Sequence, residues 1–272
     1  MTNAINTNYQ SFKFNQRIRR IIKFGIILGL ITFGYWTIIF LDIPIKRMLD
    51  MFGPLATMLA ERVFPPDLEY ASSWKVFISV IETVEMSILG AFYGTLITIP
   101  LAWCAAWNIT PSREILYPLS RSIIVLCRSL PTLMLGLLLV SLFVFGPFAG
   151  ILALAIGTIG FAGKLMAEQC EAIDMGPVDA ISATGASPLK IFIYAVLPQV
   201  KSEWTGIIIY NWDARLRGST ILGFVGAGGI GLHLRHQISI LEYHATLGII
   251  CIIVILVLFS ETLSHFCRKW AR

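Results

Sequence analysis

Six apolar stretches divide the chain, and each has the length that a helix needs to cross a lipid bilayer. A spanning helix takes about 20 apolar residues, because it rises about 1.5 Å per residue through a hydrocarbon core of about 30 Å. The stretches cover residues 21–41, 76–103, 117–145, 148–166, 191–212 and 247–265. We therefore predict an all-α polytopic membrane protein with about six transmembrane helices.

The polar segments between these stretches predict the rest of the organisation. Residues 1–20 and 267–272 are basic tails, and residues 42–75 form an outside segment before the membrane core at 76–266. Within the outside segment, apolar residues from 48 to 59 recur at helical spacing, which predicts a short interfacial helix. Six spans and an excess of inner lysine and arginine predict that both termini lie in the cytoplasm.

The composition agrees with a membrane protein. Hydrophobic residues make up 56% of the chain and charged residues 14%, whereas soluble domains contain about 25% charged residues. A net charge of +5 is what basic cytoplasmic segments produce in a membrane protein, so we expect no nucleic-acid partner. The five cysteines show no paired spacing, and no carboxylate cluster accompanies the histidines. We expect neither a disulfide framework nor a metal site.

Charged residues inside the second and third stretches are candidates for a substrate pathway. Arg121 and Arg128 are seven residues apart and share one helix face, and Ser129 follows them. An arginine inside a span costs about 2.5–3.5 kcal/mol on insertion scales unless it faces protein or water. Two interpretations stay open, and they do not exclude each other. The arginines form structural ion pairs with Glu82 or Glu85, or they line the path of an anion.

A glycine-rich loop at residues 223–231 contains Gly226, Gly228 and Gly231, which match the dinucleotide-binding pattern G-x-G-x-x-G. We reject that interpretation, because the motif requires a preceding buried strand and a later acidic residue that this helical context does not offer. A re-entrant or gating turn, with backbone N–H groups facing water or an anion, fits better. The candidate gating residues are Arg215, Arg217, Gly226, Gly228, Gly229 and Gly231.

The segment between the fourth and fifth stretches contains the sequence DAISATGASPLKIFIYAVLP, from Asp179 to Pro198. It is too polar and too broken to cross a membrane, and it predicts a helix, a glycine turn and a second helix. Ser187 suits the N-cap of the second helix, and Pro188 suits its first turn. On composition alone, an ordinary helical loop between two spans explains the segment equally well.

The spacing within this segment resembles the Glu-Ala-Ala loop of bacterial ABC-importer permeases. Asp179, Ala180, Gly185 and the Leu197-Pro198 pair fall in register, although Asp179 replaces the usual glutamate and Ile181 replaces the second alanine. In that family the loop forms a coupling helix in a groove of a partner ATPase. The resemblance implies a coupling loop at 171–198. The residues that it implies for contact with the ATPase are Asp179, Ala180, Ala183, Thr184, Gly185, Ala186 and Ser187.

Further motifs resemble the phosphonate ABC-transporter permease family from about residue 60 to the C-terminus. They are Phe64-Pro65-Pro66-Asp67, Arg128 before Pro131, Gly146-Pro147-Phe148-Ala149-Gly150, Gly176-Pro177-Val178, Ala183-Thr184-Gly185-Ala186, Val196-Leu197-Pro198-Gln199 and Val225-Gly226-Ala227-Gly228-Gly229-Ile230-Gly231. The resemblance implies a type I ABC importer permease fold in the bacterial cytoplasmic (inner) membrane. It also implies a homodimer of this chain, two ABC ATPase subunits and a periplasmic substrate-binding protein.

The substrate that the resemblance implies is phosphonate or a related phosphorus oxyanion, such as phosphite or a phosphate ester. This chain has no G-x-x-x-x-G-K-[ST] motif and no catalytic constellation, so we expect it not to be an enzyme and to bind no cofactor itself. ATP and Mg²⁺ would bind the partner ATPase. The alternatives are a permease for another small anion or an amino acid, or, less favoured, an ATP-independent transporter or channel or a membrane-embedded enzyme.

Overall fold

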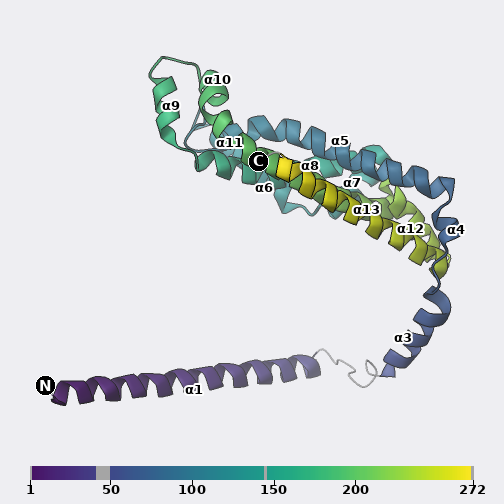
Figure 1. The fold of residues 1–272 in the computed structure, drawn as a ribbon, viewed down its shortest axis with the longest axis horizontal. Coiled ribbons are helices and arrows are strands. Elements are labelled where there is room, and N and C mark those ends of the chain that lie inside the picture. Colours follow the sequence, from purple (N-terminus) through teal and green to yellow (C-terminus); the bar gives the residue numbers. More distant parts are fainter. Residues whose placement is uncertain (1, 41–49, 144–145, 271–272) are drawn as a thin grey trace. The chain divides into compact units, whose positions relative to one another are not determined.

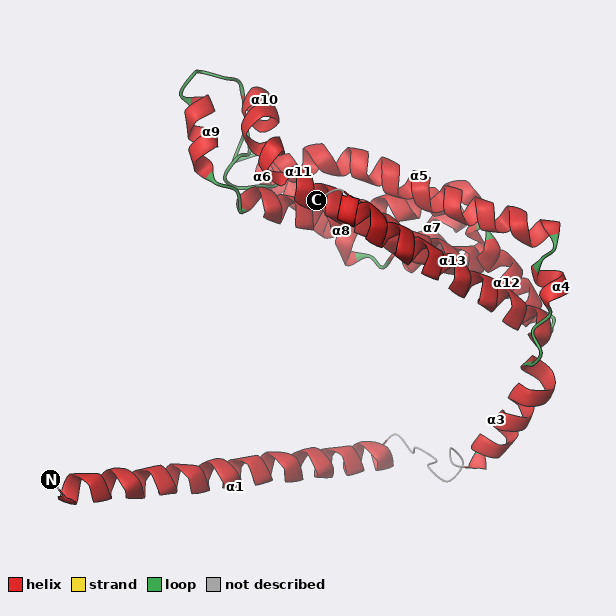
Figure 2. Ribbon diagram, viewed as in Figure 1, coloured by secondary structure: helices red, strands yellow, loops and turns green. Residues whose placement is uncertain are grey.

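The computed structural model describes residues 2–40, 50–143 and 146–270, and Figure 2 shows helices joined by loops throughout these ranges. None of the described residues lies in a β-strand, so the all-α fold class is confirmed. The chain divides into two compact units, Met1–Leu59 and Ala60–Arg272, and each is described by itself.

The first unit begins with one long helix, α1 (Thr2–Phe40), which joins the predicted basic tail to the predicted first span. Its apolar part, Ile22–Phe40, is long and apolar enough to cross a membrane, and none of it is buried inside the protein. The helix predicted between residues 48 and 59 is present as α3 (Phe52–Met58), with Met48 outside the described residues. A π-helical turn, η1 (Leu59–Val63), follows and belongs to the second unit from Ala60 on; all but one of its residues are exposed.

The second unit is a helical bundle that ends in a projecting helix pair (Figure 1). Its remaining elements are α4 (Leu68–Ala71), α5 (Trp74–Cys104), α6 (Leu116–Ser129), α7 (Thr132–Phe143), α8 (Pro147–Glu171), α9 (Met175–Ser182), α10 (Pro188–Ile191), η2 (Phe192–Val196), α11 (Leu197–Leu222), η3 (Gly223–Ala227), α12 (Ile230–Ser239) and α13 (Tyr243–Trp270). Helix α8 packs against α5, α6, α7 and α11, so it lies at the centre of the bundle.

Small residues on α5 and α8 let these two helices approach closely. A methyl group added at Gly90 would lie 2.5 Å from the Cβ of Leu154, and one added at Gly94 would lie 2.7 Å from the carbonyl oxygen of Ala155. Lipid tails are as apolar as leucine, so helices in a bilayer associate through such close packing rather than through a hydrophobic driving force. Gly90 and Gly94 of α5 therefore allow the close packing of α5 against α8.

Five of the six predicted spans have a counterpart in the structure. In the described part of the chain, α5, α8, α13 and the apolar part of α1 are long and apolar enough to cross a membrane. Helices α6 and α7 form a fifth span if they count as one. Helix α11 has 26 residues and continues ten residues past the predicted end at 212. It carries five charged side chains and is not among the helices apolar enough to cross a membrane.

The third apolar stretch is not the single straight span that its hydropathy predicts. Helices α6 and α7 meet at an angle of 88°. The break has a local cause, because Pro131 has no N–H and disfavours helical geometry at the residue before it. Leu130 accordingly adopts an extended conformation, with φ −95° and ψ 122°.

The close approach of α5 and α8 predicts that Gly94→Ala destabilises the bundle. The added methyl group would be forced against Thr158 and the carbonyl of Ala155, and overpacking of this kind costs about 1–3 kcal/mol. Gly206→Ala is the matched control, because its methyl group meets no atom within 4 Å. Thermal unfolding of the purified proteins in detergent checks this, and equal stability of the two variants would contradict it.

Candidate functional site

The 171–198 segment forms the helix, glycine turn and second helix that its sequence predicts. Helix α9 is capped by Asp174, whose carboxylate accepts a hydrogen bond from the Gly176 N–H at 3.0 Å. Gly185 has φ +76°, a left-handed conformation that glycine adopts without strain. Helix α10 then leads through η2 into α11, and α9 and α10 lie side by side at one end of the bundle (Figure 1).

Four hydrogen bonds close the base of this segment. The Asp174 N–H donates to Oε1 of Gln199 at 3.1 Å, and Nε2 of Gln199 donates to the Asp174 carbonyl at 3.2 Å. The Glu171 carboxylate accepts from Nη2 of Arg121 at 2.5 Å and from the Trp107 N–H at 3.1 Å. Together these bonds tie the chain before α9 to α11, to α6 and to the loop that follows α5.

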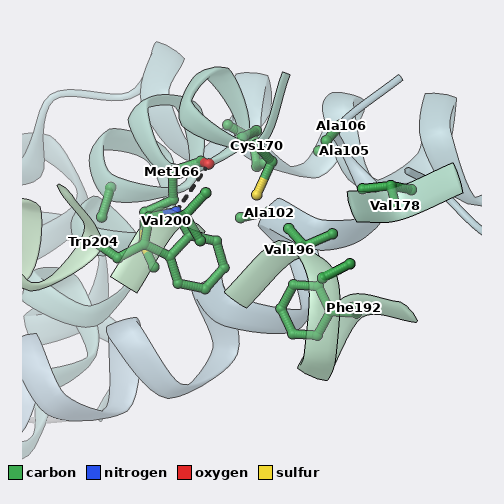
Figure 3. Close-up of a cluster of buried hydrophobic side chains, with 14 residues drawn as sticks. Ala102, Ala105, Ala106, Met166, Cys170, Val178, Phe192, Val196, Val200 and Trp204 are labelled. Atoms are coloured by element: carbon green, nitrogen blue, oxygen red, sulfur yellow. Dashed lines mark hydrogen bonds between the residues drawn. The ribbon is translucent and has the colours of Figure 1, made fainter. Parts of the chain in front are cut away.

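A buried hydrophobic cluster holds the same base from inside (Figure 3). Val178 of α9 and Phe192 of η2 contribute to it, together with Ala102 of α5 and Met166 of α8. Trp204 of α11 packs there as well, and its Nε1 donates to the Met166 carbonyl at 3.2 Å, the dashed line in Figure 3. A force on α9 would therefore reach α5, α8 and α11 directly.

The tip of the segment is exposed. Of the predicted contact residues, Ala186 is partly buried, and the others are exposed, namely Asp179, Ala180, Ala183, Thr184, Gly185 and Ser187. Ser187 occupies the predicted N-cap position of α10, but its hydroxyl makes no capping hydrogen bond. The carboxylate of Asp179 forms no ion pair within the described residues, so its charge is available at the surface.

Arg121 forms a structural ion pair, but with a different partner from the two that the sequence predicts. Its carboxylate partner is Glu171 of α8, not Glu82 or Glu85. Its Nε also donates to the Ala105 carbonyl at the end of α5, at 2.8 Å. The expected ion pair of Arg121 with Glu82 or Glu85 is therefore wrong, because the arginine lies at the end of the bundle that carries α9, where α5, α6 and α8 meet.

Arg128 and Ser129 lie at the break between α6 and α7, and both are exposed. Arg128 forms no ion pair with either glutamate in the part of the chain that the structure describes. A methyl group at Gly160 of α8 would lie 2.6 Å from the backbone nitrogen of Arg128. The glycine thus holds the end of α6 against α8, and the arginine side chain extends from that point.

The glycine-rich loop is packed against α5. Gly226, Gly228, Gly229 and Gly231 are buried, and the first three have φ between +68° and +106°. Oε2 of Glu82 accepts a hydrogen bond from the Gly229 N–H at 3.0 Å, and Oγ1 of Thr83 accepts from the next N–H at 2.8 Å. The anion that faces these backbone N–H groups is therefore the protein's own carboxylate at the start of α12. Glu85 is exposed one turn away.

The two arginines of α11 differ in how their charge is balanced. Arg217 pairs at 2.7 Å with Asp213, which is buried and also accepts a hydrogen bond from Ser260 of α13. Among the described residues, Arg215 has only neutral partners, since Nε donates to Oδ1 of Asn211 at 3.2 Å and Nη1 donates to Oγ1 of Thr132 at 3.5 Å. Sequence reasoning missed Asp213 and Asn211, although polar residues inside an apolar helix are the signal for them.

The histidines connect α12 and α13 to the chain before α5. The Tyr70 hydroxyl lies 3.2 Å from Nδ1 of His233, and Nδ1 of His244 lies 2.8 Å from the Pro65 carbonyl oxygen. Burial lowers the pKa of His233, which favours its neutral form. Among the described residues, no three His, Cys, Asp or Glu side chains come together in a group that could hold a metal ion.

Comparison with known proteins assigns the chain to a family. The family described as the binding-protein-dependent transport system inner membrane component matches residues 98–270. The chain belongs to this family. The match covers every helix from α6 to α13, including the 171–198 segment and the glycine-rich loop.

Individual relatives agree with the family assignment. This permease is 33% identical over 251 residues to the phosphite transport system permease protein PtxC of Stutzerimonas stutzeri, a match that covers 92% of this chain and 89% of that protein. It is also 40% identical over 118 residues to a protein of Escherichia coli named as a cryptic phosphonate transport system permease, PhnE2. That match covers 43% of this chain and 97% of the relative.

A solved structure shares the fold. The inward-facing structure of the MetNI methionine ABC transporter matches this permease with a TM-score of 0.64 at 23% sequence identity, over 73% of this chain and 97% of that chain. The type I importer permease fold, which the sequence motifs predict, is thereby confirmed.

The left-handed turn at Gly185 predicts that Gly185→Val abolishes transport while the protein still folds and inserts. The site has room for a side chain, so the effect comes from the backbone, where a left-handed conformation costs an ordinary L-residue about 1–2 kcal/mol. Gly185→Asn is the matched control, because asparagine tolerates this conformation. ATP-dependent uptake at equal membrane abundance checks this, and normal uptake by the valine variant would remove the turn from the mechanism.

The hydrogen bonds at the start of α12 predict that alanine substitutions at two neighbouring glutamates differ in their effect on stability. Glu82→Ala leaves a buried N–H without its carboxylate acceptor, and the loss of a hydrogen bond to a charged group costs about 1.5–3 kcal/mol of stability. Glu85→Ala removes an exposed side chain one turn away and should leave stability unchanged. Thermal unfolding in detergent compares the two. Equal losses would show that the contact with Gly229 contributes little.

Proposed function

We propose that this permease is the transmembrane subunit of an ATP-driven, binding-protein-dependent importer for phosphonate or a related phosphorus oxyanion, such as phosphite or a phosphate ester. The observation that carries the proposal is the similarity to permeases named for phosphite and phosphonate transport, at 33% and 40% identity. The phosphite relative aligns with nearly the whole chain. The substrate is thus an oxyanion, which requires positive or hydrogen-bonding groups along its path.

The exposed tip of the 171–198 segment is the proposed contact with the ATPase. It presents a single acidic residue, Asp179, on a short helix, followed by a small-residue turn around Gly185. Two ABC ATPase subunits would receive these tips, and they would bind the ATP and Mg²⁺, so this chain would hold no cofactor and catalyse no hydrolysis. The contact residues in this proposal are Asp179, Ala180, Ala183, Thr184, Gly185, Ala186 and Ser187.

Movement of the ATPases would reach the bundle through the base of the segment. The Asp174–Gln199 hydrogen bonds and the cluster around Val178 and Phe192 connect α9 tightly to the long helices. Rigid-body movement of packed helices is a common way to convert a local displacement into a change of access. ATP-driven closure would therefore open the substrate path to alternate sides of the membrane.

The proposed assembly contains a second copy of this permease and a periplasmic binding protein that delivers the substrate. The membrane is the bacterial cytoplasmic (inner) membrane, with both termini on the cytoplasmic side, the side on which the ATPases would meet the 171–198 segment. The excess of basic residues in the predicted inner segments supports this orientation.

Candidate path and gating residues follow from the described contacts. Arg128 and Ser129, exposed at the α6–α7 break, remain candidates for the path. The glycines from 226 to 231 join α11 to α12 and supply the backbone freedom that a gate between these helices would need. Arg121 and Glu82 already have structural partners, so their roles in the path would be indirect.

A second candidate is a permease for an amino acid. The observation that favours it is the fold shared with a methionine ABC transporter, although that identity of 23% shows the fold alone. The phosphorus oxyanion remains the preferred substrate, because the matches to the phosphite and phosphonate permeases are of higher identity.

Uptake into proteoliposomes tests the proposed function. The vesicles contain this permease, its candidate ATPase and its binding protein, and labelled methylphosphonate is the substrate. We expect uptake that requires ATP and that unlabelled phosphonate or phosphite blocks, whereas sulfonate and methionine do not. ATP-dependent uptake of methionine instead would retain the permease and discard the substrate. Uptake without ATP would contradict coupling through the 171–198 segment.

A further inference from the structure

Arg215 is a cation without an acidic partner in the interior of the described bundle. By contrast, Arg121 and Arg217 each have a carboxylate within 2.7 Å. Arg215 is partly buried on α11 and has no carboxylate within the 4.0 Å of an ion pair among the described residues. Its two protein partners, Asn211 and Thr132, are both neutral and leave its charge uncompensated.

The surroundings of Arg215 fix its position. Nδ2 of Asn211 donates to Oγ1 of Thr158 on α8 at 3.2 Å, which turns the Asn211 carbonyl oxygen towards the guanidinium. Gly157 of α8 provides the room, because a methyl group there would lie 2.6 Å from Nη1 of Arg215 and 2.9 Å from Oγ1 of Thr132. Three helices thus place the guanidinium, and none of them neutralises it.

The position of Arg215 is beside the break between α6 and α7. Thr132, its hydroxyl partner, is the first residue of α7. Gly160 lies one turn after Gly157 on α8 and packs against the backbone of Arg128 at the end of α6. The same face of α8 therefore brings together the guanidinium and both sides of the break, where backbone groups have lost their helical partners.

We propose that Arg215 binds the phosphorus oxyanion as it passes the α6–α7 break, and that it is the residue through which this permease recognises its substrate's charge. This inference rests on the proposed function. A guanidinium presents several N–H donors in a plane and bonds phosphate-like oxygens in pairs. A charge inside a membrane protein is costly to keep, so an uncompensated one indicates a role in function. Neutral partners hold the side chain in place without competing with the anion.

The first test compares three variants on the same helix in the reconstituted transporter. Arg215→Gln removes the charge, Arg215→Lys keeps it without the planar donor pair, and Lys201→Gln removes an exposed charge that forms no ion pair in the described part of the chain. We expect uptake of labelled methylphosphonate to fall about tenfold or more in Arg215→Gln and to be intermediate in Arg215→Lys. Lys201→Gln should transport as the wild type does.

A second readout separates recognition from structure. ATP hydrolysis stimulated by the loaded binding protein should survive in Arg215→Gln, because the 171–198 segment and its base are unchanged. Wild-type uptake of methylphosphonate tests the proposed function, and the variants test this inference alone. If wild-type uptake is present and Arg215→Gln matches it, the inference is overturned. A loss of uptake and stimulated hydrolysis together in both Arg215 variants would also overturn it in favour of a structural role.

Gly157→Ala keeps the arginine and tests the placement of its guanidinium if Arg215→Gln fails to assemble. Its methyl group would displace Nη1 and the Thr132 hydroxyl. We expect reduced methylphosphonate uptake with stimulated ATP hydrolysis retained. Gly206→Ala, which meets no atom within 4 Å on α11, is the control. Equal uptake by the two alanine variants, or failure of Gly157→Ala to assemble, would overturn the proposal, because the guanidinium's placement would then matter only for packing or not at all.

Discussion

The close approach of α8 to its neighbours is the constraint on which the rest of the bundle depends. Alanine and glycine line its buried surface, so the backbones of α5 and α6 approach it closely. In lipid, where no hydrophobic driving force acts between helices, such van der Waals packing holds them together. The same absence of side chains creates space at Gly157 for a guanidinium. Packing and the placement of charge therefore follow from one sequence property, and added side-chain volume on this face of α8 would affect both.

The charged residues of the bundle divide by what balances them. Arg121 and Glu171 close the base of the 171–198 segment, Asp213 joins Arg217 to α13, and Glu82 meets the backbone N–H groups at the start of α12. Each of these charges stabilises a junction between elements that are distant in sequence. Asp213 is the buried one among these charges, and a buried charge that loses its partner is strongly destabilising. This arrangement suits a protein that moves by displacement of packed helices rather than by local unfolding.

Local features were predictable from the sequence, and long-range partners were not. The turn at Gly185 follows from the conformational freedom of glycine, and the apolar stretches follow from hydropathy. The 88° break was not predicted, although Pro131 without its N–H is the local signal for it, because residues 117–145 form one continuous apolar stretch by hydropathy. The partner of Arg121 was wrong because the choice between Glu82 and Glu171 depends on which helix ends meet. The reach of α11 to Leu222 was missed because Asp213, Arg215 and Arg217 interrupt the apolar pattern, although each of them has a partner within the protein.

A transporter must bind its substrate strongly enough to accept it and weakly enough to release it. Several unpaired arginines along a path would bind a phosphorus oxyanion too tightly. A path without any arginine would leave the desolvation cost of the anion uncompensated. Carboxylates already balance Arg121 and Arg217, whereas among the described residues Arg215 has only an amide and a hydroxyl as partners and the exposed Arg128 forms no ion pair. Neutral ligands can also exchange for substrate oxygens without creating a buried charge. In the proposed path, the pairing of Arg121 and Arg217 therefore matters as much to anion passage as the lack of a carboxylate at Arg215.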